Sequence, residues 1–550
     1  MDHMSIPRAL IPRGAVTAAA TVTTIAVTLG LAACTSTTSY GPTTGSPSTG
    51  ATATPSGGAT SGGSGASGAG SPAIVPENST ISWQPCTGAN NGMQCASIQV
   101  PLNYADPQGR KITLALSMIP ATAPVSQQQG VLLVNPGGPG ASGLSFAGQI
   151  AAGLSPQVAA TYDIVGFDPR GVGSSVPALS CDPSFFDGVR PNYDFANAAA
   201  EQVLIDRAKT YAADCEKRFG WFLPYMTTVN TARDMDQIRK AFGVQQINYY
   251  AFSYGTYLGQ VYGTLFPSRV RRMVLDSTVD PTGAWYADNI SQDYAFQGRF
   301  DAFLAWVAKY DSVYHLGTTS AQVGAAYATA RKRLTQTPVD GPNGPLIGPD
   351  ELDDTFLIGG YVTWIWPDLA EALAQYVNSG NTAGLVSMYN TAGAQNENLF
   401  AVYNAIECGD VNWPRNWSKW QSDTEKVYQT APYEAWPNAW FNAACAFWPV
   451  KGPATPFKVD GAKLPPILML QGTLDPATPY AGAQDAHKLL PSARMVVVRG
   501  SGIHGQSMAS PPDPCVQNYL NSYLASGALP EQPGLVNATC PAMPDPTPGT

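Results

Sequence analysis

The chain has 550 residues, which is ample length to bury a large hydrophobic core. Its formal net charge at pH 7 is -9, and the sequence contains no cluster of basic residues. Nucleic acid and anionic membrane surfaces are therefore disfavoured as partners.

The first 34 residues have the pattern of a bacterial lipoprotein signal peptide. Arg8 and Arg13 precede an apolar, small-residue run over 15–33, and Leu31-Ala32-Ala33-Cys34 ends it. A charged start, an apolar middle and small residues before a cysteine predict that Cys34 is acylated. The protein is then expected on the extracytoplasmic side of the cell membrane, held by lipid alone. A plain transmembrane anchor is the alternative.

A tether follows the signal. Ser, Thr, Gly and Pro dominate residues 35–75, with almost no apolar bulk to bury. Such composition predicts a flexible linker.

The region 76–280 is expected to form the first part of an α/β core. A continuous apolar strand over 131–134 is followed directly by Asn135-Pro136-Gly137-Gly138-Pro139-Gly140. Glycines allow backbone N–H groups to approach a developing oxyanion with no side chain between them. Gly138 is the first candidate donor from this loop, and Gly137 is the second.

Residues 138–143 also satisfy the dinucleotide-binding pattern G-x-G-x-x-G, with Asp168 as a possible ribose-binding acid. Pro139, however, removes an amide donor where a pyrophosphate would need one. The oxyanion interpretation is therefore favoured, and no cofactor is expected. Asp168-Pro169-Arg170-Gly171 is instead expected to close a loop beneath the site through hydrogen bonds.

Ser253 is the candidate nucleophile. It lies in Ala251-Phe252-Ser253-Tyr254-Gly255, between a strand-like run over 247–250 and a helix-like run over 256–266. A strand that turns at once into a helix strains the residue at the turn, so only small residues fit two positions on either side. The N–H of Tyr254, next after the nucleophile, is the second expected oxyanion donor.

Residues 281–456 are rich in Trp, Tyr and Ala and have longer helical periodicities, which predict a helical cap. Strand-like and helix-like runs alternate before this region and resume over 457–550, the second part of the core. The alternation predicts a mostly parallel sheet with helices on both faces and an inserted cap, an α/β-hydrolase fold.

Asp475 is the candidate acid. It follows a buried-strand run over 466–472 and precedes His504 by 29 residues, which leaves room for one helix and one strand. The order Ser253, Asp475, His504 is the chain order of α/β-hydrolases. The alternative makes Asp475 a turn or helix-cap residue before Pro476.

His504 is the candidate base among four histidines. It lies in a glycine-flanked loop after a β-rich run, where close approach to a nucleophile is possible. His3 falls in the predicted signal and His315 in the cap, while His487 is expected to be a solvated side chain on a surface helix.

With these residues assembled, the chain resembles the α/β-hydrolase exopeptidases of the tripeptidyl-aminopeptidase and proline-iminopeptidase group, in particular actinobacterial lipoprotein serine proteases. The motifs that carry the resemblance are NPGGPGASG over 135–143, GFDPRGVG over 166–173, AFSYGTYLG over 251–259, CAFWP over 445–449 and DPATPY over 475–480. The resemblance spans about 82–540 and implies the same three catalytic residues. Ala251, where glycine is usual, and Glu407, at a position where relatives vary, depart from the pattern and leave substrate preference open.

Eight cysteines remain after Cys34, and an even number outside the cytoplasm suggests disulfides. Eight cysteines allow 105 pairings. Proximity and the resemblance favour nearest neighbours: Cys86 with Cys95, Cys181 with Cys215, Cys408 with Cys445, and Cys515 with Cys540. Zinc is the competing use of cysteine, but no C-x-x-C pair occurs and no metal site is expected.

The resulting expectation is an extracytoplasmic serine exopeptidase that releases residues or short peptides from free amino termini through an acyl-enzyme. Glu407 and Asp410 are the candidate partners of a substrate α-ammonium, because they flank Cys408 and a disulfide there would hold them rigidly; for Asp410 the alternative is a role in stabilising a turn. A carboxylesterase or lipase on the same triad is one alternative function, and a catalytically inactive cell-surface binding lipoprotein is another.

Overall fold

The computed structural model describes residues 79–341 and 344–549. The predicted signal peptide, Cys34 and the linker over 35–75 lie outside the described residues. Within the described ranges, no helix combines the length and the apolar character that a membrane crossing requires.

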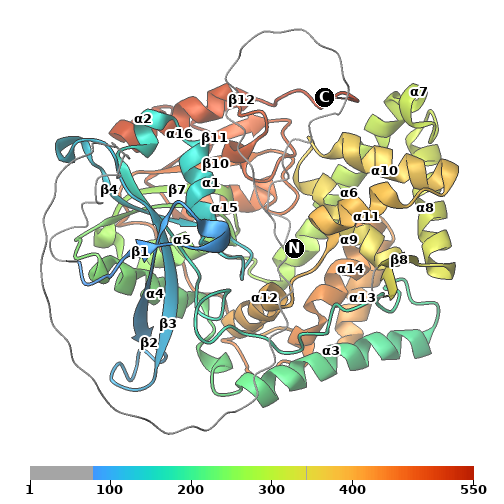
Figure 1. Ribbon diagram of the computed structural model, residues 1–550, viewed down its shortest axis with the longest axis horizontal. Helices are drawn as coiled ribbons and strands as arrows, with labels where there is room; N and C mark the ends of the chain where they lie inside the picture. The colour runs from blue at the N-terminus through green and yellow to red at the C-terminus, as the bar shows by residue number, and fades with distance from the viewer. Residues whose placement is uncertain (1–78, 342–343, 550) are drawn as a thin grey trace, which may run out of the picture.

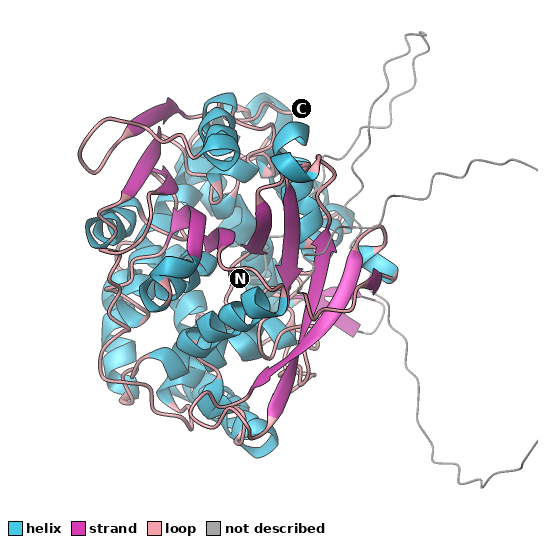
Figure 2. Ribbon diagram, turned by 90° about the vertical axis from the view of Figure 1, so that its left-hand side faces the viewer, coloured by secondary structure: helices cyan, strands magenta, loops and turns pink. Residues whose placement is uncertain are grey.

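A ten-stranded sheet forms the centre of the core, in the order β1-β2-β3-β5-β4-β6-β7-β10-β11-β12 (Figures 1 and 2). The strands are β1 (Gln84–Pro85), β2 (Gln94–Pro101), β3 (Lys111–Ile119), β4 (Gly130–Asn135), β5 (Tyr162–Phe167), β6 (Ile247–Ser253), β7 (Val270–Thr278), β10 (Ile467–Gly472), β11 (Ala493–Arg499) and β12 (Ala538–Pro541). The pairings from β1 to β5 are antiparallel, and those from β5 to β12 are parallel. The mostly parallel sheet confirms the predicted fold class.

Both faces of the parallel part are buried. Along β4, Val131 and Leu133 join one hydrophobic cluster, while Leu132 and Val134 join another on the opposite face. This is why the run reads as continuously apolar rather than alternating. The first face packs against α4 (Thr228–Ala241), α5 (Tyr254–Leu265) and α15 (Tyr480–Leu489), and the second against α1 (Phe146–Gly153), α2 (Pro156–Ala159) and α16 (Pro514–Ser526).

Helices inserted between β7 and β10 form a cap, which occupies the right-hand side of Figure 1. They are α6 (Tyr286–Lys309), α7 (Asp311–Tyr314), α8 (Ser320–Gln336), α9 (Pro349–Tyr361), α10 (Trp366–Ser379), α11 (Ala383–Met388), α12 (Glu397–Asp410), α13 (Trp417–Tyr428) and α14 (Pro432–Asn442), with a short hairpin of β8 (Val339–Gly341) and β9 (Gly344–Ile347). Helices α6 to α11 share a hydrophobic core of their own, whereas α12 packs into the core of the sheet domain.

One further helix belongs with the cap, although it comes much earlier in the sequence. Helix α3 (Ala198–Phe219) packs Leu204 and Ala208 against Trp436 and Trp440 of α14. The cap therefore draws on residues before the nucleophile, in addition to the predicted insertion over 281–456.

Four disulfides tie the described chain together: Cys86–Cys95, Cys181–Cys215, Cys408–Cys445 and Cys515–Cys540. They are the nearest-neighbour pairs. Cys408–Cys445 joins α12 to the segment after α14, so it holds the helix that carries Glu407 against the rest of the molecule.

Candidate active site

Ser253 lies at the sharp turn where β6 ends and α5 begins. Its backbone has φ 54° and ψ -131°, which is unfavourable for a residue with a side chain. The small neighbours are required sterically, because a Cβ on Gly255 would lie 3.0 Å from the Cβ of Ala251 and 2.6 Å from Asn135 Oδ1. Ala251 itself is fully buried, so its methyl group is accommodated in the turn.

Asp475 and His504 form a buried pair. The imidazole Nδ1 lies 2.9 Å from Asp475 Oδ1 and 3.0 Å from Oδ2, and the residues are 2% and 4% exposed. Asp475 Oδ1 also accepts from the N–H groups of Ala477 and Thr478, and Oδ2 accepts from the Thr478 hydroxyl. The aspartate therefore shapes its own turn and orients the imidazole, so the two roles weighed from the sequence are not exclusive.

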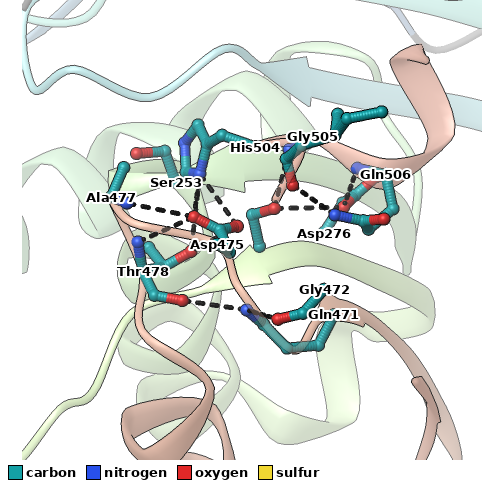
Figure 3. A network of polar contacts seen from close by, with 12 residues as sticks. Ser253, Asp276, Gln471, Gly472, Asp475, Ala477, Thr478, His504, Gly505 and Gln506 are labelled. Atoms are coloured by element: carbon teal, nitrogen blue, oxygen red, sulfur yellow. Dashed lines mark hydrogen bonds and ion pairs between the residues drawn. The ribbon is translucent and has the colours of Figure 1, made fainter. Parts of the chain in front are cut away.

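The other ring nitrogen of His504 is available for chemistry. Nε2 is buried and has no hydrogen-bond partner among the described residues, and Figure 3 shows Ser253 beside the imidazole. An imidazole that donates from Nδ1 to a carboxylate presents an unprotonated Nε2, which can take a proton from a serine hydroxyl. This arrangement can perform nucleophilic acyl transfer.

A second buried carboxylate holds the loop that carries His504. Asp276, at the end of β7, accepts 2.8 Å hydrogen bonds from the N–H groups of Gln506 and Ser507, while Ser277 Oγ accepts from Gly505 N at 2.7 Å (Figure 3). Burial raises the pKa of Asp276 to about 6, against the lowering effect of these hydrogen bonds. Asp276 is not among the site residues predicted from the sequence, although it lies at the end of an apolar strand.

The glycine loop after β4 lies against the nucleophile turn. Gly137 N donates to Asn135 Oδ1 at 2.9 Å, and a Cβ on Gly137 would lie 2.9 Å from the Ser253 Cβ. Gly138 and Tyr254 line the same cavity as Ser253. Since the Gly137 amide is already engaged, the N–H groups of Gly138 and Tyr254 remain the candidate oxyanion donors.

A cavity of about 280 Å³ opens over Ser253 between the sheet domain and the cap. Trp285, Asn289 and Tyr403 line it from the cap side, and Ala477 and Pro479 from the sheet side. Its volume is at the small end of ligand pockets, so it suits a short segment of substrate.

The two expected ammonium-binding carboxylates have different surroundings. Glu407 lines the cavity, is 3% exposed, and accepts a 3.3 Å hydrogen bond from Asn289 Nδ2. Burial raises the pKa of Glu407 well above its usual range. Asp410 does not line this cavity and instead accepts from Thr228 N at 2.8 Å and Thr228 Oγ1 at 2.5 Å. It holds the start of α4 and is not placed to bind substrate.

Asp168 and His487 are both buried polar residues outside the triad. Asp168 accepts from Ser142 Oγ and Gly143 N and so closes the glycine loop, while Arg170 pairs with Asp234 at 2.7 Å in the interior. The expectation for His487 is wrong, because it is 5% exposed. Its ring nitrogens each lie 3.1 Å from a backbone carbonyl oxygen, of Leu535 and Ala493.

No group of three or more His, Cys, Asp or Glu side chains placed to hold a metal ion occurs in the described part of the chain.

The family model described as "alpha/beta hydrolase fold" matches residues 130–506, more than half of the chain, and the chain belongs to that family. The fold, the strained serine and the buried aspartate–histidine pair make it a serine hydrolase.

The chain is similar along most of its length to two peptidases and one esterase. The chain is 41% identical to a tripeptidyl aminopeptidase of Streptomyces lividans over 462 residues, covering 81% of this chain and 84% of the relative. It is 32% identical to serine protease Hip1 of Mycobacterium tuberculosis, covering 82% and 89%. It is also 33% identical to carboxylesterase B of Mycobacterium tuberculosis, covering 84% and 90%.

Proposed function

We propose that this protein is a serine exopeptidase that releases short peptides or residues from free amino termini through an acyl-enzyme on Ser253. Similarity to a tripeptidyl aminopeptidase and to a serine protease over more than four fifths of the chain supports peptide substrates. The observation that carries the preference for a free amino terminus is Glu407, a buried carboxylate in the wall of the cavity over the nucleophile.

The physical argument is one of unpaired charge. A substrate α-ammonium gives Glu407 an ionic partner in a partly desolvated cavity, whereas an acetylated amino terminus leaves the carboxylate unpartnered. The Cys408–Cys445 disulfide holds α12 in place, so the carboxylate cannot easily withdraw to water. The cap limits access from above, which favours chain ends over internal segments.

The test compares short peptide anilides with free and acetylated amino termini, in the wild-type protein and in Glu407→Gln. We expect kcat/KM to favour the free substrate by about 100-fold or more, and the substitution to reduce that ratio to near one. Asp410→Asn is the matched control, because Asp410 lies on the same helix outside the cavity. Equal kcat/KM for free and acetylated substrates would remove the aminopeptidase proposal.

An esterase is the second candidate, and the observation that favours it is the similarity to carboxylesterase B. The same triad hydrolyses esters and amides, so the triad does not separate the two. Efficient cleavage of p-nitrophenyl esters together with no cleavage of any unblocked peptide would select the esterase.

We also propose that Cys34 carries lipid and that the enzyme is anchored on the extracytoplasmic side of the membrane. The support is the signal-like sequence over 1–34, the linker composition after it, and four disulfides, which are usual for proteins outside the cytoplasm.

A further inference from the structure

The charged residues that line the cavity over Ser253 are all acidic. Four carboxylate residues line it, and no Lys, Arg or His is among its lining residues: the acids are Asp280, Asp288, Glu407 and Asp485. One of them, Glu407, is assigned above to the α-ammonium of the substrate. The remaining three raise the question of whether a second positive group is bound.

Two of the three remaining acids already have partners. Asp280 Oδ1 accepts from the backbone N–H of Thr282 at 2.8 Å and from its hydroxyl at 2.7 Å. Asp485 pairs with Lys488 at 2.5 Å on the exposed face of α15. Their charges contribute to the field in the cavity, and one oxygen of each carboxylate, Oδ1, is engaged.

Asp288 differs, because its unpartnered oxygen is buried. Oδ2 is buried and has no hydrogen-bond partner among the described residues, yet the residue lines the cavity. A buried charged oxygen without a partner is costly, and such groups are usually satisfied by a ligand or an ion. Asp288 therefore stands apart from the other acids.

The surroundings of Asp288 keep this carboxylate in place. It lies in the first turn of α6, where the helix dipole favours negative charge. Gly283 lies directly against it, since a Cβ there would come within 2.0 Å of Asp288 Oδ1. Any larger residue at position 283 would displace the carboxylate, so the observed position of the Asp288 side chain requires glycine there.

We propose that Asp288, with Asp280 nearby, is a specificity-determining residue that receives a cationic side chain of the peptide, of the lysine or arginine type. This rests on the proposed exopeptidase function and adds a substrate class to it. The cation would give the Asp288 carboxylate an ionic partner, while an uncharged side chain of similar length would leave it without one.

The electrostatics agree with this geometry. Burial, and secondarily the charge of Asp280, raise the pKa of Asp288 well above its usual range. An empty subsite therefore favours the protonated acid, and a bound cation favours the ionised one. No fixed basic residue of the described cavity lining competes for this role.

The experiment uses the full chain and free-amino tripeptide anilides in which each of the three positions in turn carries lysine, arginine or norleucine, with alanine elsewhere. We expect one position to favour lysine over norleucine by at least about tenfold in kcat/KM. In Asp288→Asn the lysine-to-norleucine ratio at that position should fall to near one. Gly283→Ala is a second variant, because its methyl group displaces the same carboxylate.

The matched control is Asp301→Asn, an exposed acid on the same helix, which should keep the wild-type ratio. Absence of a lysine preference at every position, or its persistence in folded Asp288→Asn and Gly283→Ala, overturns the proposal. A loss of the free-over-acetylated preference in Asp288→Asn, with the lysine ratio unchanged, also overturns it and assigns Asp288 to the α-ammonium. Failure of the proposed function is distinguishable, since the wild-type protein would then not cleave Ala-Ala-Ala anilide at all.

Discussion

At the scale of single residues, the expected catalysis depends on Ser253 in a strained turn and on the His504 imidazole, which the buried Asp475 carboxylate orients. Members of such a triad act as one unit, so removing any one of them loses most of the rate. We expect Ser253→Ala, His504→Ala and Asp475→Asn each to lower kcat by roughly 10⁴-fold or more. Steady-state kinetics on an anilide substrate measures this.

The control for the base is His315→Ala, because His315 is an exposed residue of the cap and should keep full activity. His487→Ala is expected to lower the melting temperature instead, since its two contacts to carbonyl oxygens lie in the interior. Full activity in His504→Ala would show that the base is assigned to the wrong histidine.

The pH dependence of substrate preference is also set by one residue. Burial raises the pKa of Glu407 above the usual carboxyl range, so its ionised form appears only as the pH rises through that pKa. The ratio of kcat/KM for free over acetylated substrate should therefore increase from acid toward neutral pH. It should fall again above about pH 8, where the substrate α-ammonium loses its proton.

Taking the ratio removes the titration of the triad, which affects both substrates alike. Glu407→Gln should make the ratio independent of pH on the acid side. A wild-type ratio that rises steadily toward low pH contradicts the role given to Glu407.

At the scale of structural elements, the loop after β11 is positioned by the end of β7. Asp276 and Ser277 receive three consecutive N–H groups of that loop, directly after His504. Asp276→Asn replaces one acceptor oxygen with a donor that opposes a backbone N–H. We expect kcat to fall about 10- to 100-fold, with little change in KM, because the imidazole is misplaced while the cavity is intact.

The rate of labelling by a fluorophosphonate should fall in parallel, since it reports the reactivity of Ser253 rather than substrate binding. Ser277→Ala should show a smaller loss, because it removes one hydrogen bond. Unchanged kcat and labelling in folded Asp276→Asn would mean that the loop is held by its other contacts alone.

Much of the site was predictable because its residues occur at strand ends. Ser253 is the last residue of β6, and Asp475 and His504 lie in the loops that follow β10 and β11. The carboxyl ends of parallel strands meet at one edge of the sheet. Asp276 also lies near the end of an apolar strand, but no known motif contains it, so its role could not be predicted from the sequence.

Other features depend on contacts distant in sequence. His487 appeared to be a surface residue because its helix is polar, yet its partner Leu535 comes 48 residues later. The role of α3 in the cap is set by Trp436 and Trp440, more than 200 residues away. Asp410 gave no sign in sequence that it binds Thr228 rather than substrate. Periodicity describes an element, and it does not describe the surface against which the element packs.

At the scale of the whole molecule, the lipid anchor is tested at Cys34, which lies outside the described residues. Cys34→Ser removes the thiol that would be acylated, so we expect loss of detergent-phase partitioning and a changed mature amino terminus. Triton X-114 partitioning and amino-terminal sequencing measure both. Unchanged partitioning and an unchanged amino terminus would rule out the anchor.

At the same scale, action at chain ends rather than at internal peptide bonds is tested most directly by following one unblocked decapeptide and its acetylated twin by mass spectrometry. The account predicts that the unblocked peptide loses short fragments stepwise from its amino terminus. The acetylated twin should remain intact over the same period, and Ser253→Ala should cleave neither. Internal fragments, or equal rates of cleavage for the two peptides, would contradict it.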